Sequence, residues 1–251
     1  LKKKAMKKIL FLLILVFAST VSAQSLSEEY AAIMNDLMYM KYKQKFKHLD
    51  KVFKDNPNDP WYYWMKADIY ALGEKDKETR ACYEKAISLD STFAAGYGSY
   101  ARYLVNNVDG DFEKAVELST KAIELDRTEF YYYIDRAEAY LKLKKYDEAL
   151  SDAFFYIDQD GVFVFVGQMV LINCYIEQND QEKLKELLMS FAVNEIDFMA
   201  GPDLAIRIGD YYLSYGDQER ACGAFRVAAE NYDMLGGKAP DDFQEKLNKC
   251  E

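Results

Sequence analysis

A pattern of small and aromatic residues recurs along this chain with a period of about 35 residues. The stretch DRAEAYLKLKKYDEALSDAFFYI, residues 135–157, places such residues at helical intervals and fills the gaps with charges. Four other segments align with it. One aligned position advances by 34, 36, 35 and 37 residues, through Tyr70, Leu104, Tyr140, Tyr175 and Tyr212. Self-similarity at this period is typical of a solenoid, in which each repeat contacts only its neighbours.

The composition favours helices. The 251 residues include only 12 Gly and 4 Pro, so few positions interrupt regular structure, and half of the residues are hydrophobic. We therefore expect an all-α fold. The segment GVFVFVGQMV, residues 161–170, is by itself typical of a buried strand. Because it lies where the first helix of a repeat begins, we predict a helix from residue 162.

The pattern resembles that of the tetratricopeptide repeat family, a helix-turn-helix unit of 34 residues. Small residues are typical of its eighth, twentieth and twenty-seventh positions, and aromatic residues of its eleventh and twenty-fourth. Ala137, Tyr140 and Ala149 follow this pattern, whereas Ala153 and Tyr156 depart from it. Other segments keep the twenty-fourth aromatic, at Tyr83 and Phe225. The resemblance implies a right-handed α-solenoid of antiparallel helix pairs.

The repeat register predicts the organisation of the chain. We expect five repeats, at residues 60–93, 94–129, 130–163, 165–198 and 202–235. Residues 24–59 read as a divergent first repeat. Residues 240–251 read as a capping helix, because Phe243 and Leu247 lie four apart, on one helical face.

The small residues have a physical role in such a pair. Two helices approach to roughly 8–9 Å when the side chains between them are small. We expect Ala137 and Ala149 to provide this contact and Tyr140 to fill the groove towards the next pair. Tight turning or a positive φ is expected within the repeats, at Gly73, Gly110, Asn179 and Gly216.

The N-terminus has the pattern of a secretory signal. Five lysines precede an unbroken apolar run from Ile9 to Ala18, and Val21-Ser22-Ala23 provides small residues for cleavage. We expect cleavage after Ala23, with residues 1–23 as the signal peptide and a periplasmic or secreted product. An uncleaved anchor is the alternative. The apolar run is shorter than the roughly 20 residues of a spanning helix, so we expect no membrane span in the mature chain.

The charge of the exported chain argues against two classes of partner. Residues 1–23 contain five lysines and no acidic residue, so the remainder has 27 basic and 42 acidic residues, a net charge of −15. Such a surface repels phosphate groups. We therefore expect neither nucleic acid nor an anionic membrane as a partner.

We expect neither a metal site nor enzymatic activity. His48 is the only histidine, and none of the four cysteines forms a CxxC pair. A serine or cysteine nucleophile lacks a histidine base other than this residue, which lies in a lysine-rich segment. The sequence contains no P-loop, GxGxxG or HExxH motif, and we expect no cofactor.

Export permits disulfides. Cys222 begins the second helix of the last repeat and Cys250 ends the capping helix, so antiparallel packing would bring their sulfurs together. Cys82 and Cys174 lie in repeats separated by a whole unit, and we expect them to be buried free thiols. Free thiols at all four positions are the alternative.

The resemblance implies a concave groove lined by the first helices of the repeats. The family positions that face this groove correspond here to Trp61, Trp64, Asp68, Arg102, Asn106, Tyr131, Ile134, Glu138, Lys142, Met169, Asn173, Glu177, Ile206 and Asp210. Acidic residues alternate with apolar and aromatic ones, which suggests an extended polypeptide with basic and apolar side chains. We expect a non-enzymatic protein- or peptide-binding scaffold of the bacterial cell envelope.

Three alternatives stay open at this point. The aromatic residues of the groove could instead pack against neighbouring repeats. Exposed aromatic faces could stack on sugars in a carbohydrate-binding envelope protein. The chain could also assemble with itself, as a homo-oligomeric scaffold built through its convex face.

Overall fold

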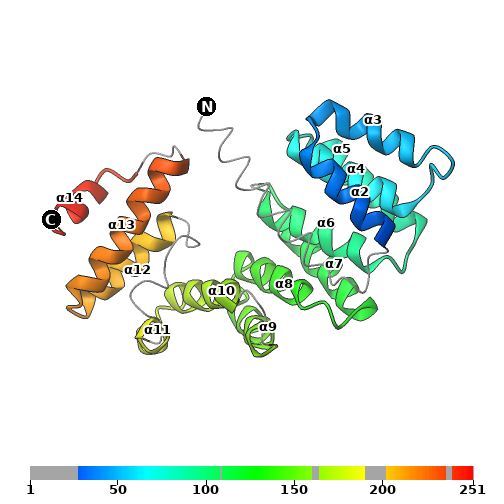
Figure 1. Cartoon of the computed structure of the whole chain (residues 1–251). Helices are drawn as coiled ribbons and strands as arrows, with labels where there is room; N and C mark the ends of the chain where they lie inside the picture. Colours follow the sequence, from blue (N-terminus) through cyan, green and yellow to red (C-terminus); the bar gives the residue numbers. More distant parts are fainter. Residues whose placement is uncertain (1–27, 108, 160–163, 190–201, 236–238, 251) are drawn as a thin grey trace. The chain divides into compact units, whose positions relative to one another are not determined.

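The computed structural model describes residues 28–107, 109–159, 164–189, 202–235 and 239–250, and within these ranges the regular structure is entirely helical (Figure 1). The predicted signal peptide and its cleavage site lie outside these ranges. So do residues 162 and 163, the first two of the helix predicted from residue 162. The described part of the chain is an all-α arrangement of helix pairs. The chain forms two compact units, one reaching to Leu171 and the other beginning at Ile172.

The first unit consists of successive antiparallel helix pairs. Its helices are α2 (Glu28–Tyr39), α3 (Tyr42–Val52), α4 (Pro60–Leu72), α5 (Asp76–Leu89), α6 (Ala94–Asn106), α7 (Phe112–Leu125), α8 (Tyr131–Lys142) and α9 (Tyr146–Asp158). α4 packs against α5, α6 against α7 and α8 against α9, and α6 also packs against α4 and α8. The first helices of consecutive repeats are therefore neighbours.

The helix α10 (Val164–Glu177) contains the boundary between the units. It includes most of the apolar segment that alone is typical of a strand, so the prediction of a helix there is confirmed for residues 164–170. The register of the repeat outweighs the local preference of β-branched residues. The second unit continues with α11 (Gln181–Met189), α12 (Pro202–Ser214), α13 (Gln218–Leu235) and the short α14 (Phe243–Asn248).

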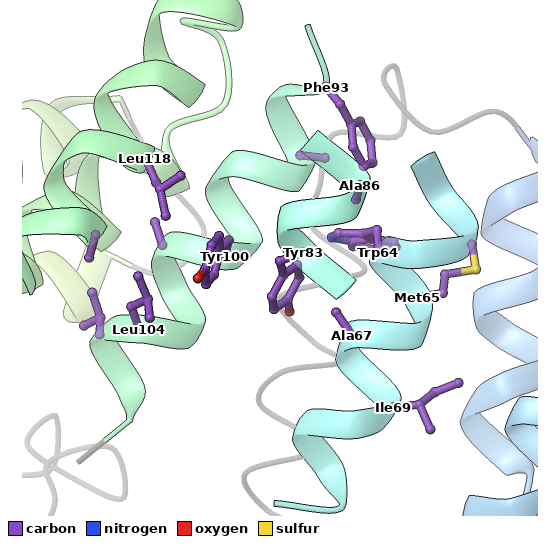
Figure 2. Packing of buried hydrophobic residues seen from close by; sticks show 14 of the residues in the cluster. Trp64, Met65, Ala67, Ile69, Tyr83, Ala86, Phe93, Tyr100, Leu104 and Leu118 are labelled. Carbon is purple, nitrogen blue, oxygen red and sulfur yellow. The ribbon is translucent and has the colours of Figure 1, made fainter. Parts of the chain in front are cut away.

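The small residues of the repeat lie at the closest helix contacts. Those with no measurable exposure include Ala67, Ala86, Ala101, Ala115, Ala122, Ala137, Ala149, Ala153, Ala221 and Ala228. At Gly209 a Cβ atom would lie 2.4 Å from Cε1 of Phe225, so even alanine is too large there. Larger side chains fill the space between repeats. Figure 2 shows Tyr83 of α5 against Tyr100 of α6, with stacked rings 5.3 Å apart.

The turn within the repeat has a recurring geometry. Glu74, Lys144, Asn179 and Gly216 have φ values of 55°, 59°, 54° and 77°. In each case the next residue donates its N–H to the carbonyl five positions earlier, at the aligned positions Tyr70, Tyr140, Tyr175 and Tyr212. This bond closes the helix in a Schellman motif. Gly73 turns tightly at φ −91°, so the positive φ falls one residue later than Gly73.

The repeat from α6 to α7 differs, because its turn is longer. Gly110 lies so close to α6 that a Cβ atom would be 1.9 Å from the carbonyl oxygen of Leu104. Close approach of the backbone, rather than a positive φ, therefore requires glycine here.

The aligned aromatic position is buried less uniformly than the repeat pattern implies. Leu104 and Tyr212 are buried, whereas Tyr70 and Tyr140 are only partly buried. The expectation that Tyr140 fills the groove towards the next pair therefore holds only in part. Its ring also lies beside the Arg136 guanidinium, 6.0 Å from ring centroid to Cζ.

The second unit contains a disulfide bond near its C-terminal end. Cys222, near the start of α13, is bonded to Cys250, two residues beyond α14, with Cα atoms 5.3 Å apart. Phe243 packs beside Phe225 and Tyr232 of α13, with ring centroids 6.3 and 6.0 Å away. Of the remaining cysteines, Cys174 is buried, as expected, but Cys82 is only half-buried.

Candidate functional site: the first-helix face

The expected groove positions of the first unit lie on α4, α6 and α8, which pack side by side. Those that stay at least partly exposed define what we call the first-helix face: Trp61, Asp68, Arg102, Asn106, Tyr131, Glu138 and Lys142. The seven residues come from three consecutive repeats of one unit, and the helices that bear them are neighbours.

Three expected groove residues are buried instead, and their assignment to an exposed surface is wrong. Trp64 and Ile134 are each 2% exposed, and Ile206 of α12 is also buried. The fifth position of a repeat faces the adjoining helices here. Trp64 packs edge-on against Trp61, with ring centroids 5.3 Å apart.

Trp61 is held between neighbouring elements. Its ring stacks on Tyr30 of α2 at 4.7 Å and meets Phe93 at 4.6 Å in an edge contact. Each of these pairs is worth about 0.5–1.5 kcal/mol beyond the area that it buries. Much of the surface of the two tryptophans thus packs against neighbouring helices, as the alternative for the aromatic residues proposed.

An ion pair between Arg102 and Asp135 links α6 to α8. The Nε of Arg102 lies 3.0 and 3.1 Å from the two carboxylate oxygens of Asp135, and Nη2 lies 3.0 Å from one of them. The guanidinium also lies 5.7 Å from the ring centroid of Tyr131. Nearby carboxylates outweigh the effect of burial and raise the pKa of Arg102, so this residue stays charged. Asn106 donates its Nδ2 to the Arg102 carbonyl at 2.9 Å, which orders the end of α6.

Asp68 is an acidic residue in a desolvated position. Burial raises its pKa to about 6, although the Tyr83 hydroxyl donates a hydrogen bond to it and Arg102 provides a positive charge nearby. The same burial, with the charge of Asp68, raises the pKa of Tyr83. At neutral pH the Tyr83 hydroxyl therefore keeps its proton and donates it in the hydrogen bond to Asp68.

Glu138 lies one turn further along α8 than Asp135. Burial and then the negative charge of Asp135 raise its pKa to about 7, against the weaker opposing effects of Arg102 and Lys142. Lys142 is exposed and lies four residues beyond Glu138. A carboxyl group with this pKa is divided between its neutral and charged forms near neutral pH.

The remaining expected residues belong to the other helices. Met169 and Asn173 of α10 are half-buried. Glu177 pairs with Arg207 of α12 at 2.7 Å, and Asp210 pairs with Lys246 of α14 at 2.8 Å. Both acidic side chains are thus already paired within the second unit.

Sequence reasoning missed Asp135 and Tyr83, which fix the charged side chains of the face. A signal existed for Asp135, because it lies 33 residues after Arg102, close to one repeat period. No comparable spacing identifies Tyr83, whose position in the repeat is that of an ordinary core aromatic.

No cluster of three or more histidine, cysteine, aspartate or glutamate side chains in the described part of the chain could hold a metal ion. None of the helices with described positions combines the length and apolar character that crossing a membrane requires.

Comparison with known proteins supports the repeat assignment. Residues 62–93 match the model of the tetratricopeptide repeat family. Among curated proteins, the chain is 52% identical over 46 residues to an SGT1 homolog of Oryza sativa subsp. japonica. It is 39% identical over 72 residues to a DnaJ homolog subfamily C member 7 homolog of Dictyostelium discoideum. These matches span 18% and 28% of this chain but only 12% and 13% of the relatives.

Solved structures share the fold over most of the chain. PilW, a type IV pilus biogenesis factor, matches with a TM-score of 0.64 at 12% identity, over 88% of this chain and 100% of its own. PilF of Pseudomonas aeruginosa gives 0.68 at 14% identity, over 88% and 95%. A tetratricopeptide repeat protein of Parabacteroides merdae gives 0.60 at 12% identity, over 92% and 88%. The resemblance inferred from the sequence is confirmed, and at these identities the likeness is one of fold.

Proposed function

We propose that this chain, whose fold is that of tetratricopeptide repeat proteins, is a non-catalytic scaffold that binds an extended polypeptide on its first-helix face. The observation that carries the proposal is the row of partly exposed polar and aromatic side chains across α4, α6 and α8. A polypeptide laid over neighbouring helices meets side chains at regular intervals, which suits an extended partner.

The chemistry of the face supports binding rather than catalysis. Arg102 is engaged by Asp135, and Asp68 accepts a hydrogen bond from Tyr83. Fixed charges of this kind orient a partner and lose little conformational freedom on binding. The alternative of a sugar platform is weakened by the burial of Trp64 and the ring contacts of Trp61.

Export to the cell envelope is part of the proposal and rests on the N-terminal pattern. Five lysines followed by the apolar run to Ala18 support a secretory signal. The partner is therefore an envelope or secreted polypeptide.

The test isolates a partner and then measures where it binds. The exported chain serves as bait in an extract of the native envelope, and a captured protein is purified and titrated by calorimetry. Asn106→Trp places a large side chain on the first-helix face. Glu117→Trp places the same side chain on the exposed surface of α7.

We expect Asn106→Trp to weaken binding at least tenfold and Glu117→Trp to leave it within twofold. The reverse pattern would move the binding surface to the second helices of the repeats. Equal effects of the two variants would show that the partner does not bind specifically to the first-helix face.

A further inference from the structure

The surroundings of Arg102 contain more negative than positive charge. Its guanidinium interacts with the carboxylates of Asp135, Glu138 and Glu129, and it lies near enough to Asp68 to act on that group as well. Asp135 takes the bidentate contact with Arg102. Among the described residues, Asp68 and Glu138 form no ion pair, so Arg102 interacts with several acids but takes its bidentate contact from Asp135.

The two unpaired acids differ in what they can offer to a partner. Asp68 already accepts a hydrogen bond from the Tyr83 hydroxyl. Glu138 has no hydrogen bond or ion pair in the described part of the chain, and its side chain is partly exposed. Its oxygens are therefore available to a donor that approaches from the first-helix face.

The same place already holds one guanidinium group. Arg102 lies between the Asp135 carboxylate and the Tyr131 ring, which is the arrangement that favours a planar cation. Glu138 follows Asp135 by three residues on α8, so its carboxylate is on the same side of that helix.

We propose that Glu138 binds the guanidinium or ammonium group of a basic side chain in the polypeptide partner. This inference rests on the proposed function and specifies its ligand chemistry. A charge-assisted hydrogen bond to a partly desolvated carboxylate is stronger than a neutral one and selects for a cation. The partner thus has an arginine or a lysine in the segment that crosses α8.

Lys142 competes with the partner's basic side chain for the Glu138 carboxylate. It lies four residues after Glu138, the spacing at which a glutamate and a lysine on a helix attract each other. It is exposed and forms no ion pair with a described residue. Removing its charge therefore strengthens the attraction of Glu138 for an external cation.

Binding is coupled to pH. A bound cation favours the ionised carboxylate, so binding releases a proton wherever free Glu138 is protonated. Affinity therefore rises with pH up to about 7, the pKa of Glu138, and then levels off. The titratable and charged groups that act on Glu138 are Asp135 and Lys142 of α8 and Arg102 of α6. Arg102 in turn interacts with Glu129, Asp68 of α4, Tyr83 of α5 and Tyr156 of α9. Asp68, with a pKa of about 6, adds a smaller rise at lower pH.

The experiment uses two small probes of the same shape. N-acetyl-arginine amide carries the guanidinium, and N-acetyl-citrulline amide replaces it by a neutral urea. Each is titrated into the full exported chain up to about 100 mM, and NMR shifts report the dissociation constant. Glu138→Gln and Lys142→Gln are the test variants, and Asp158→Asn, at the exposed end of α9, is the matched control.

We expect the arginine probe to bind about tenfold more tightly than the citrulline probe, because its hydrogen bonds are charge-assisted. Glu138→Gln abolishes this preference and the pH dependence near 7. Lys142→Gln increases the affinity a few fold, and Asp158→Asn changes nothing. A purely structural role of Glu138 would not give opposite effects of these two variants.

Equal affinity for the two probes, no binding of either, or an unchanged Glu138→Gln variant would each overturn the inference. Its failure is distinguishable from that of the proposed function. A captured partner that is lost with Asn106→Trp but retained by Glu138→Gln leaves the first-helix face in place and removes only the cation site.

Discussion

The carboxylate of Asp135 accepts the Nε and Nη2 hydrogens of Arg102 at 3.0 to 3.1 Å, and the two residues belong to the first helices of consecutive repeats. Asp135 is almost fully buried, with 6% of its side chain exposed, and Arg102 is 22% exposed. The pair therefore connects α6 to α8 in a largely desolvated position.

Loss of one partner should be costly. Arg102→Met leaves a buried carboxylate without its cation, and we expect the free energy of unfolding to fall by about 3 kcal/mol. Urea denaturation measures the change. Adding Asp135→Leu to this variant removes the unpaired charge and should restore most of the loss. Two equal and additive losses would show that the residues act independently.

The alanine contacts should tolerate no larger side chain. Ala137 has no measurable exposure, so Ala137→Leu overpacks α8 against its neighbours and should cost about 1–3 kcal/mol. Thermal denaturation compares it with Lys144→Leu, an exposed substitution in the following turn. A melting temperature equal to that of the wild type would mean that Ala137 is not at a close helix contact.

Tyr140→Ala is expected to cost less than truncation of a core aromatic. The ring is only partly buried, so the loss should fall below the roughly 3–5 kcal/mol of a fully buried aromatic. Phe225→Ala, at a position with no exposure, provides the comparison and should reach that range. Equal losses in the two variants would contradict the difference in burial.

Periodicity predicts most of the fold but little of the face. The alanine positions and the helix over 164–170 follow from the repeat register, because stacking requires the same contacts in every unit. The burial of Trp64 and Ile134 does not follow, since it depends on the side chains of adjoining helices. The pairing of Asp135 with Arg102 likewise depends on packing between repeats, and the residues of one repeat do not specify it.

The pH dependence of stability should reveal Glu138. Its folded pKa of about 7 lies above that of an unfolded glutamate, so the folded state binds more protons between about pH 4 and 7. The stabilisation is complete below about pH 4 and is lost as the pH rises through 7. Because the side chain is partly exposed, we expect Glu138→Gln to exceed the wild type by only about 1–2 kcal/mol at pH 8.

The difference between Glu138→Gln and the wild type should vanish near pH 4, where both side chains are neutral. Denaturation at several pH values measures it. Asp68, whose pKa of about 6 does not depend on Glu138, still makes the free energy of unfolding vary with pH at lower pH in both proteins. A difference independent of pH would show that the variant acts through packing.

The Cys222–Cys250 bond should be present in the exported protein. The Cα atoms lie 5.3 Å apart, within the range of a disulfide. Replacing both cysteines by alanine should lower the free energy of unfolding by about 3–4 kcal/mol in the chain-entropy model. Peptide mapping without reduction identifies the bond directly. Four alkylatable thiols would rule it out.

Photo-crosslinking in living cells tests the central claim most directly. A benzoylphenylalanine replaces Asn106 on the first-helix face in one strain and Glu117 on the exposed surface of α7 in another. We predict that a specific polypeptide crosslinks from position 106 and not from position 117, and that mass spectrometry places an arginine or lysine near the attachment point. Crosslinks from position 117 alone, or the same products from both positions, would contradict binding on the first-helix face.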